Sequence, residues 1–146
     1  MKLTEQILLL NNLKEDTKNL WGKMTPQHMI EHLILSLQIS NNKLATSCFT
    51  PEEKLPTLKK VLMSERPFPK GFVNALTGDG LPELTYSDLS KAKSVLEQET
   101  KDFYLYFEKY PDAKLINPTF GELNKEEWEQ FHKKHFTHHL SQFGLV

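Results

Sequence analysis

Histidines spaced four residues apart near the end of the chain are the clearest candidates for chemistry. Four of the six histidines lie between residues 131 and 143, and His135 and His139 are two of them. A helix turns about 100° per residue, so side chains at i and i+4 project from nearly the same face. Two imidazoles at this spacing are the usual way for a helix to offer two nitrogens to one metal ion. A histidine-rich amphipathic helix whose rings are simply hydrogen-bonded is the alternative.

A second helix is predicted from about Pro26 to Asn41, and it carries a further histidine. Thr25 has the residue type of an N-cap, and proline is well suited to the first helical position. The apolar face of this helix carries His28, Met29, His32, Leu35 and Ile39. His32 therefore lies in the middle of a stripe that should face the core, where an unpaired imidazole would need a partner.

Together, His32, His135 and His139 would offer three neutral imidazole nitrogens from two helices. Packed helices lie about 8–10 Å apart, which suits histidines that reach one ion from both sides. Three nitrogens around Zn²⁺, Ni²⁺ or Fe²⁺ leave at least one position for water or substrate. We predict a metal site at these three residues; the alternative is three core histidines, each bonded to a carbonyl.

Three further side chains flank the predicted site. His28 and His138 lie about 40–60° from the nearest ligand around their helices, so either could act as an acid or base. Gln142 lies about 20° from His135 in helical projection, as does Trp128 on the other side. Gln142 could donate to a bound anion or orient His139.

The rest of the chain predicts helices that position these residues. Helical spacing also covers residues 3–14, about 87–110 and 124–144, the last with a capping box of Asn124 and Glu127. Between residues 42 and 85 the pattern weakens to one short helix, 50–62, and turn signals that include Gly71 and Thr77–Asp79. A connection this long suggests a crossover that makes the second and third long helices parallel. No stretch alternates like a strand, so we predict one all-α four-helix bundle over residues 1–146.

Composition limits the classes of function. The 18 basic and 19 acidic residues give a net charge of −1 and no basic face, which disfavours nucleic-acid binding. Apolar runs are too short to span a membrane, and no secretory signal is recognised. The single cysteine, Cys48, excludes an intramolecular disulfide and fits a reducing cytoplasm.

Other catalytic patterns are weaker. Residues 28–32 read H-x-x-E-H, as in inverted zinc proteases, but those enzymes are much larger and need a further glutamate ligand. Glu129 and His132 form one Glu-x-x-His pair, whereas a di-iron bundle needs two and further glutamates. Cys48 has no neighbour in the sequence that would activate it as a nucleophile.

Two motifs resemble the DinB-like (YfiT-like) superfamily of metal-binding helical bundles. Residues 21–33, Trp-Gly-Lys-Met-Thr-Pro-Gln-His-Met-Ile-Glu-His-Leu, resemble its second-helix signature. Residues 135–144, with a His-x-x-x-His followed by Gln, resemble its fourth-helix signature. The Trp-Gly-Lys-Met opening, the Pro-Thr-Phe-Gly-Glu-Leu loop and the His-His-Leu-Ser-Gln-Phe-Gly ending are similar to one uncharacterised branch, and the resemblance covers nearly the whole chain.

The resemblance implies an up-down-down-up bundle with a divalent ion bound by His32, His135 and His139. Characterised members include metal-dependent thiol S-transferases that use low-molecular-weight thiols, and related isomerases and hydrolases. A small-molecule substrate, a cytoplasmic location and a homodimer are in keeping with it. The chain departs from the branch at Asn117, where a histidine often precedes the proline, and this puts any role of that histidine in doubt.

Two hypotheses therefore remain open from the sequence. The first is an enzyme that performs metal-assisted thiol transfer or hydrolysis at the three-histidine site. The second is a non-catalytic bundle in which a structural ion joins two helices and an exposed face serves assembly or binding. A fourth protein ligand, such as His28 or His138, would favour the second hypothesis.

Overall fold

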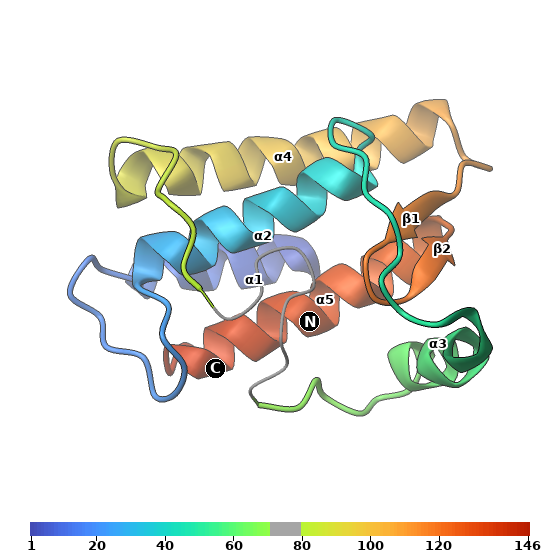
Figure 1. Cartoon of the computed structure of the whole chain (residues 1–146). Coiled ribbons are helices and arrows are strands. Elements are labelled where there is room, and N and C mark those ends of the chain that lie inside the picture. The colour runs from blue at the N-terminus through green and yellow to red at the C-terminus, as the bar shows by residue number, and fades with distance from the viewer. Residues whose placement is uncertain (71–79) are drawn as a thin grey trace.

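A computed structural model describes residues 1–70 and 80–146 of the chain. Its elements, in chain order, are helix α1 (Leu3–Leu9), a 3₁₀ turn η1 (Leu10–Asn12), α2 (Pro26–Ser40), η2 (Glu52–Lys54), α3 (Leu55–Met63), α4 (Leu89–Lys109), strands β1 (Leu115–Asn117) and β2 (Gly121–Leu123), and α5 (Lys125–Gln142) (Figure 1). Among the described residues, no helix is both long and apolar enough to cross a membrane.

The long helices begin at side chains that cap them. The Thr25 side chain accepts a hydrogen bond from the backbone N–H of His28, and Asp88 accepts one from Lys91. At the start of α5, Asn124 and Glu127 form the expected reciprocal capping box. Each cap satisfies backbone donors that a helix end leaves without partners, so the positions where α2, α4 and α5 begin are locally determined.

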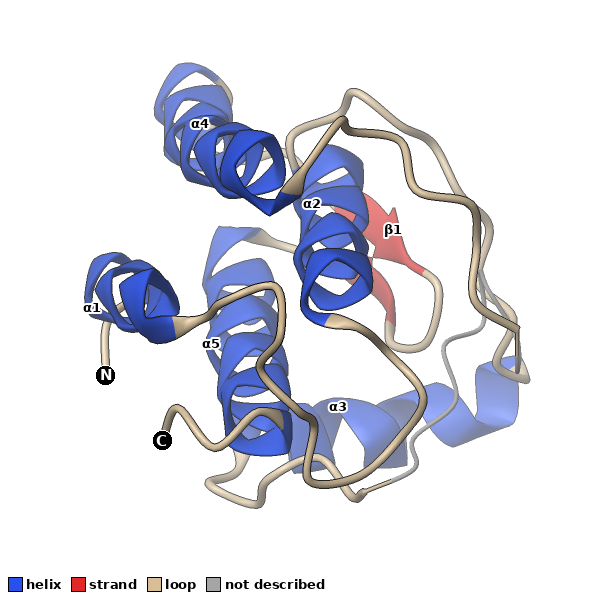
Figure 2. Cartoon of the chain, turned by 90° about the vertical axis from the view of Figure 1, so that its left-hand side faces the viewer, coloured by secondary structure: helices blue, strands red, loops and turns tan. Residues whose placement is uncertain are grey.

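Helix α2 lies between α4 and α5 and packs against both, as Figures 1 and 2 show from two directions. The inner face of α4 is apolar and buried; this face comprises Leu89, Ala92, Leu96, Phe103 and Phe107. Helix α1 packs on α5, where the buried Gln6 donates to the Lys133 carbonyl and to Thr137 Oγ1 at 3.0 and 2.8 Å. The face of α5 that carries His135 and His139 is turned toward His32 of α2.

The prediction of an all-α four-helix bundle is wrong. The described residues contain five α-helices and a two-stranded antiparallel sheet, so the fold mixes helix with strand. In the hairpin Leu115 pairs with Leu123 and Asn117 with Gly121. The Asn117 Oδ1 atom accepts from the backbone N–H groups of Thr119 and Phe120 at 2.9 and 3.0 Å and so closes the turn. Strands of three residues are too short to show the alternation by which strands are recognised in a sequence.

The fifth helix, α3, is the short helix predicted over residues 50–62, and it begins later than predicted, at Leu55, directly after the 3₁₀ turn η2. It packs on the outer side of α5, where Lys134 Nζ donates to the carbonyls of Val61, Leu62 and Ser64 at 2.8, 3.3 and 3.4 Å. These are carbonyls at the carboxyl end of α3, which lack partners within the helix. The turn signals at Gly71 and Thr77–Asp79 lie outside the described residues. The up-down-down-up scheme therefore omits a helix that covers α5.

Candidate metal centre

The packing of α2 on α5 brings His32, His135 and His139 together. Their potential ligand atoms all lie within 4.8 Å of one another. The ring centroid of His32 is 4.8 Å from that of each partner, and those of His135 and His139 are 4.9 Å apart. All three side chains are buried. Three imidazoles from two helices thus form one buried group that could hold a metal ion.

Burial keeps these rings neutral at pH 7. It lowers the pKa of His32 to about 4, with the charge of His138 a smaller cause. It also lowers the pKa values of His135 and His139 well below 6.5, and repulsion from His32 adds to the shift of each. A neutral imidazole is the form that gives a lone pair to a metal, so burial removes most of the competition from protons.

The orientation of His139 is set by a chain of two hydrogen bonds. Its Nδ1 lies 2.8 Å from Oε1 of Gln142, which can only accept, so Nδ1 carries the proton. The Nε2 group of Gln142 donates in turn to the Trp21 carbonyl at 3.0 Å. This leaves Nε2 of His139 as its ligand atom, in the tautomer that metal-binding histidines adopt when the other nitrogen donates.

The next residue, Gly22, makes room for this arrangement. Its φ of +83° lies in the left-handed region, and a Cβ at this position would overlap Nε2 of Gln142. Glycine is therefore required both by the backbone conformation and by the approach of the glutamine. The connector that precedes α2 thus contributes to the placement of a histidine on α5.

The spacing of the donors fits a small divalent ion. The Nε2 atoms of His32 and His135 are 2.8 Å apart, and the widest separation in the group is 4.8 Å. Zinc–nitrogen bonds of about 2.0–2.1 Å in a tetrahedral site place ligand nitrogens about 3.3 Å apart, between these limits. Because both rings are neutral, one of the two Nε2 atoms can carry a proton and donate it to the other. A metal ion in place of that proton would receive a lone pair from each nitrogen.

His28, a predicted acid or base, is committed elsewhere. The Thr25 hydroxyl donates to its Nδ1 at 2.6 Å, and its Nε2–H donates to the Pro82 carbonyl at 3.1 Å. The Nδ1 contact therefore lies within the cap of α2, and the Nε2 contact holds the start of α2 to the segment that leads into α4.

His138, the other predicted acid or base, lies next to the group without joining it. Its half-buried ring is 5.0 Å from that of His139 and stands edge-on to Trp21 at 6.0 Å. Burial lowers the pKa of His138, and a hydrogen bond with the Phe68 backbone partly opposes the shift. Of the three flanking candidates, Gln142 contacts a member of the group through a hydrogen bond and His138 lies beside one.

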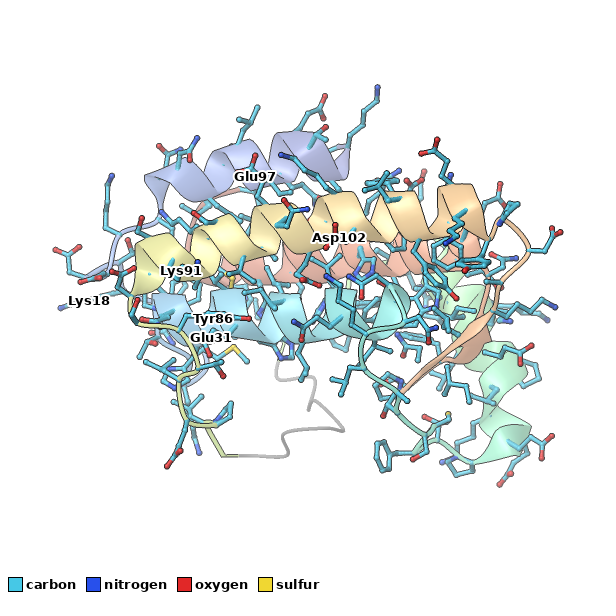
Figure 3. The ribbon with its side chains drawn as sticks, turned by 90° about the horizontal axis from the view of Figure 1, so that it is seen from above. Lys18, Glu31, Tyr86, Lys91, Glu97 and Asp102 are labelled. Atoms are coloured by element: carbon cyan, nitrogen blue, oxygen red, sulfur yellow. The ribbon has the colours of Figure 1, made fainter. Side chains whose placement is uncertain are left out.

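The H-x-x-E-H pattern has a structural explanation. The Glu31 carboxylate accepts from the backbone N–H groups of Thr85 and Tyr86 at 2.7 and 3.2 Å and from the Gln27 side chain at 3.0 Å. Glu31 and Tyr86 lie side by side in Figure 3. This glutamate therefore ties α2 to the segment before α4, and it lies outside the three-histidine group.

The remaining candidates also have structural positions. Asn117 is buried and closes the hairpin turn, and its Nδ2 has no hydrogen-bond partner among the described residues. His132 is fully buried, bonded through Nε2 to Ser40 Oγ at 2.8 Å, and stacked on Trp128 at 5.5 Å. Trp128 therefore neighbours His132 rather than His135. The Sγ of Cys48 lies 3.8 Å from the Thr50 carbonyl, away from the histidines in the sequence and in its contacts.

Sequence reasoning missed the part played by residues 21 and 22. They read as a connector, and the hydrogen bond that matters is made by a backbone carbonyl, which leaves no signal in residue type. The glycine at position 22 was the available signal, because a glycine in a short connector often marks a left-handed conformation or a close approach.

The comparisons with known proteins bear on the second half of the chain. A family model described as "Protein of unknown function (DUF1569)" matches residues 84–144, which include α4, the hairpin and α5. The match therefore covers His135 and His139, but it begins after α2 and does not include His32. A search of curated proteins and a search of solved structures each found no match.

Proposed function

We propose that this protein is a divalent-metal-dependent enzyme whose ion is held by His32, His135 and His139. The observation that carries the proposal is the buried group of three neutral imidazoles with all ligand atoms within 4.8 Å. Burying three imidazoles in one small region is costly unless each finds a partner. The buried Nδ1 of His135 has none among the described residues, so the group is not explained by hydrogen bonding alone.

The resemblance to the DinB-like superfamily suggests the class of reaction. We propose thiol S-transfer or hydrolysis of a small molecule, with a low-molecular-weight thiol or water as the attacking group. A zinc, nickel or iron ion would supply a Lewis acid that lowers the pKa of that group. The matched family model adds no activity to this argument, because its own description names none.

Residues of the chain would support this chemistry in three ways. Gln142 holds His139 in the tautomer that presents Nε2 to the group. The Phe131 ring, 4.9 Å from that of His135, helps to exclude water from one side. His138, whose lowered pKa favours the neutral ring, would accept a proton from the attacking group or from the substrate.

A structural ion in a non-catalytic protein is the alternative. That role favours a closed coordination shell with a fourth protein ligand. Both ring nitrogens of His28 are occupied elsewhere, and no residue in the described ranges besides the three histidines belongs to the group. These observations support a centre with an open position. A chelator should therefore remove the activity completely, whatever its effect on the melting temperature.

Metal analysis of the purified protein, joined to a screen of thiol transfer and ester hydrolysis with several divalent ions, tests the proposal. We expect one ion per chain, lost together with turnover in His32→Ala and His135→Ala. His28→Gln is the matched control. The ring nitrogens of His28 bond Thr25 and Pro82, outside the three-histidine group, so this variant should keep its metal. Full metal content in both alanine variants would refute the site; bound metal with no turnover under any ion would favour the structural alternative.

A further inference from the structure

A cavity lies on the side of α5 that carries His138. Its volume is about 500 Å³, within the range of about 300–1,000 Å³ typical of small-molecule sites. Its walls come from the connector before α2, from residues 65–70 after α3, and from one face of α5. His138 belongs to the wall, and its ring is 5.0 Å from that of His139. The cavity is thus separated from the three-histidine group by little more than one ring.

Aromatic side chains form part of the cavity wall. Trp21 is half-buried and stands edge-on to His138, and Phe68 is buried and packs against Phe120 and Phe131 at 5.9 Å each. The packing fixes Phe68 on the α5 side of the cavity. The rings of Trp21 and Phe68 in the wall suit a small ligand with a flat or apolar part.

The charge of the lining is positive. It includes Lys70, Lys133 and Lys134, against one acid, Glu65. The Lys134 ammonium is bound to three carbonyls of the α3 end, so it is committed to the fold. Lys70 lies 4.6 Å over the Trp21 ring and has no carboxylate partner in the part of the chain that the structure describes.

Lys133 has only a weak partner. Its Nζ is 3.6 Å from Glu129 one helical turn away, and both side chains are about one-third exposed. Exposed pairs of this kind contribute little and exchange readily, so the ammonium can turn toward a ligand. Lys70, from the segment after α3, and Lys133, from α5, therefore both line the cavity with ammonium groups that lack a close carboxylate partner in the described part of the chain.

We infer that this cavity binds a small organic anion, with its apolar or aromatic part against Trp21 and Phe68 and its carboxylate or phosphate between Lys70 and Lys133. Taking that anion to be the substrate rests on the proposed function, since it assigns the reacting end of the molecule to the neighbouring metal centre. The binding itself does not depend on the metal. The inference narrows the substrate from any small molecule to an acidic one with an apolar body.

Binding is tested on the full chain in the presence of a chelator, so that no acid can bind through a metal. The probes are phenylacetate and phenyl phosphate, with phenylacetamide as the neutral counterpart. The chain has two tryptophans, so its NMR spectrum has two indole N–H signals. We expect the Trp21 signal to shift saturably with either anion and that of Trp128, buried in the core, to stay in place.

The charge requirement is tested with Lys70→Gln and Lys133→Gln, alone and combined. Each should weaken anion binding by up to about fivefold and the pair by about tenfold or more, as expected for partly exposed charge pairs. Lys91→Gln and Lys101→Gln on α4 remove the same charge far from the cavity and should have no effect. Circular dichroism shows whether each variant is folded.

Three results would overturn the inference: no saturable shift of Trp21, equal binding of phenylacetamide, or equal losses in the α4 controls. The proposed function fails separately. A protein that binds the anions but holds no metal at the histidines would refute the metal centre and leave the cavity assignment intact. A protein that holds the metal but binds no anion would refute the cavity assignment alone.

Discussion

Replacing Gly22 by alanine should weaken metal binding at a centre to which Gly22 contributes no ligand. Gly22 has a φ of +83°, and a Cβ there would overlap Nε2 of Gln142. The glutamine would have to leave its hydrogen bond with the Trp21 carbonyl, and with it the position from which Oε1 accepts the Nδ1 proton of His139. The substitution thus acts on the histidine through one intervening side chain.

The magnitude follows from two separate costs. Placing a residue with a Cβ in the left-handed region costs about 1–2 kcal/mol. Losing the hydrogen bond between Gln142 and the Trp21 carbonyl adds about 1 kcal/mol. We therefore expect Gly22→Ala to lower the free energy of unfolding by about 2–3 kcal/mol. Loss of a residue that orients a metal ligand commonly weakens metal affinity by about 10–100-fold.

Gly144→Ala is the matched control. Gly144 also has a left-handed φ, +69°, but a Cβ there would meet only the Leu20 side chain at an ordinary 3.8 Å. This variant should lose about 1–2 kcal/mol of stability from backbone strain alone. Its metal affinity should match that of the unmodified chain.

The assay is urea unfolding of the metal-free proteins together with competition for zinc against a chromophoric chelator. We expect both variants to lose stability and only Gly22→Ala to lose metal affinity. Equal zinc affinities in the two variants would refute the role assigned to Gln142, as would a Gln142→Ala variant with unchanged affinity.

Two further predictions concern residues next to the centre. Burial lowers the pKa of His132 to about 3, against about 6.5 in an unfolded chain, so the unfolded state binds the extra proton first as the pH falls. As the pH falls from 6.5 to 3, the buried His132 therefore lowers the free energy of unfolding by up to about 1.4 kcal/mol per pH unit. Urea unfolding of metal-free His132→Leu at a series of pH values should show a shallower acid dependence; an unchanged slope would contradict the neutral buried ring. Glu31→Ala should lower the unfolding free energy by about 1–3 kcal/mol because two backbone N–H groups lose their acceptor, while metal content stays the same. Loss of the metal in folded Glu31→Ala would restore the reading of residues 28–32 as part of the site.

The histidines that lie together could be recognised from the sequence because helical geometry is local. Spacing alone placed His135 and His139 on one face of α5, and an N-cap with an apolar stripe placed His32 on the inner face of α2. The structure brings the three rings together; that they bind a metal remains a prediction.

What the sequence could not reveal depends on contacts between distant segments. Asn117 closes the turn between strands β1 and β2, and three residues in each strand are too few for a periodic signal. The place of α3 depends on Lys134, whose side chain binds the helix end rather than solvent. The tautomer of His139 depends on Gln142, which is held in turn by the carbonyl of Trp21, 121 positions earlier in the chain.

A titration of the metal-free protein with Co²⁺ tests the central claim most directly, because the absorption spectrum of cobalt reports both the stoichiometry and the ligands. The account predicts one ion per chain, with the spectrum of a site of nitrogen ligands and low coordination number, and loss of that spectrum in folded His135→Ala. A folded wild-type chain that binds no cobalt, or a His135→Ala variant with an unchanged spectrum, would contradict it.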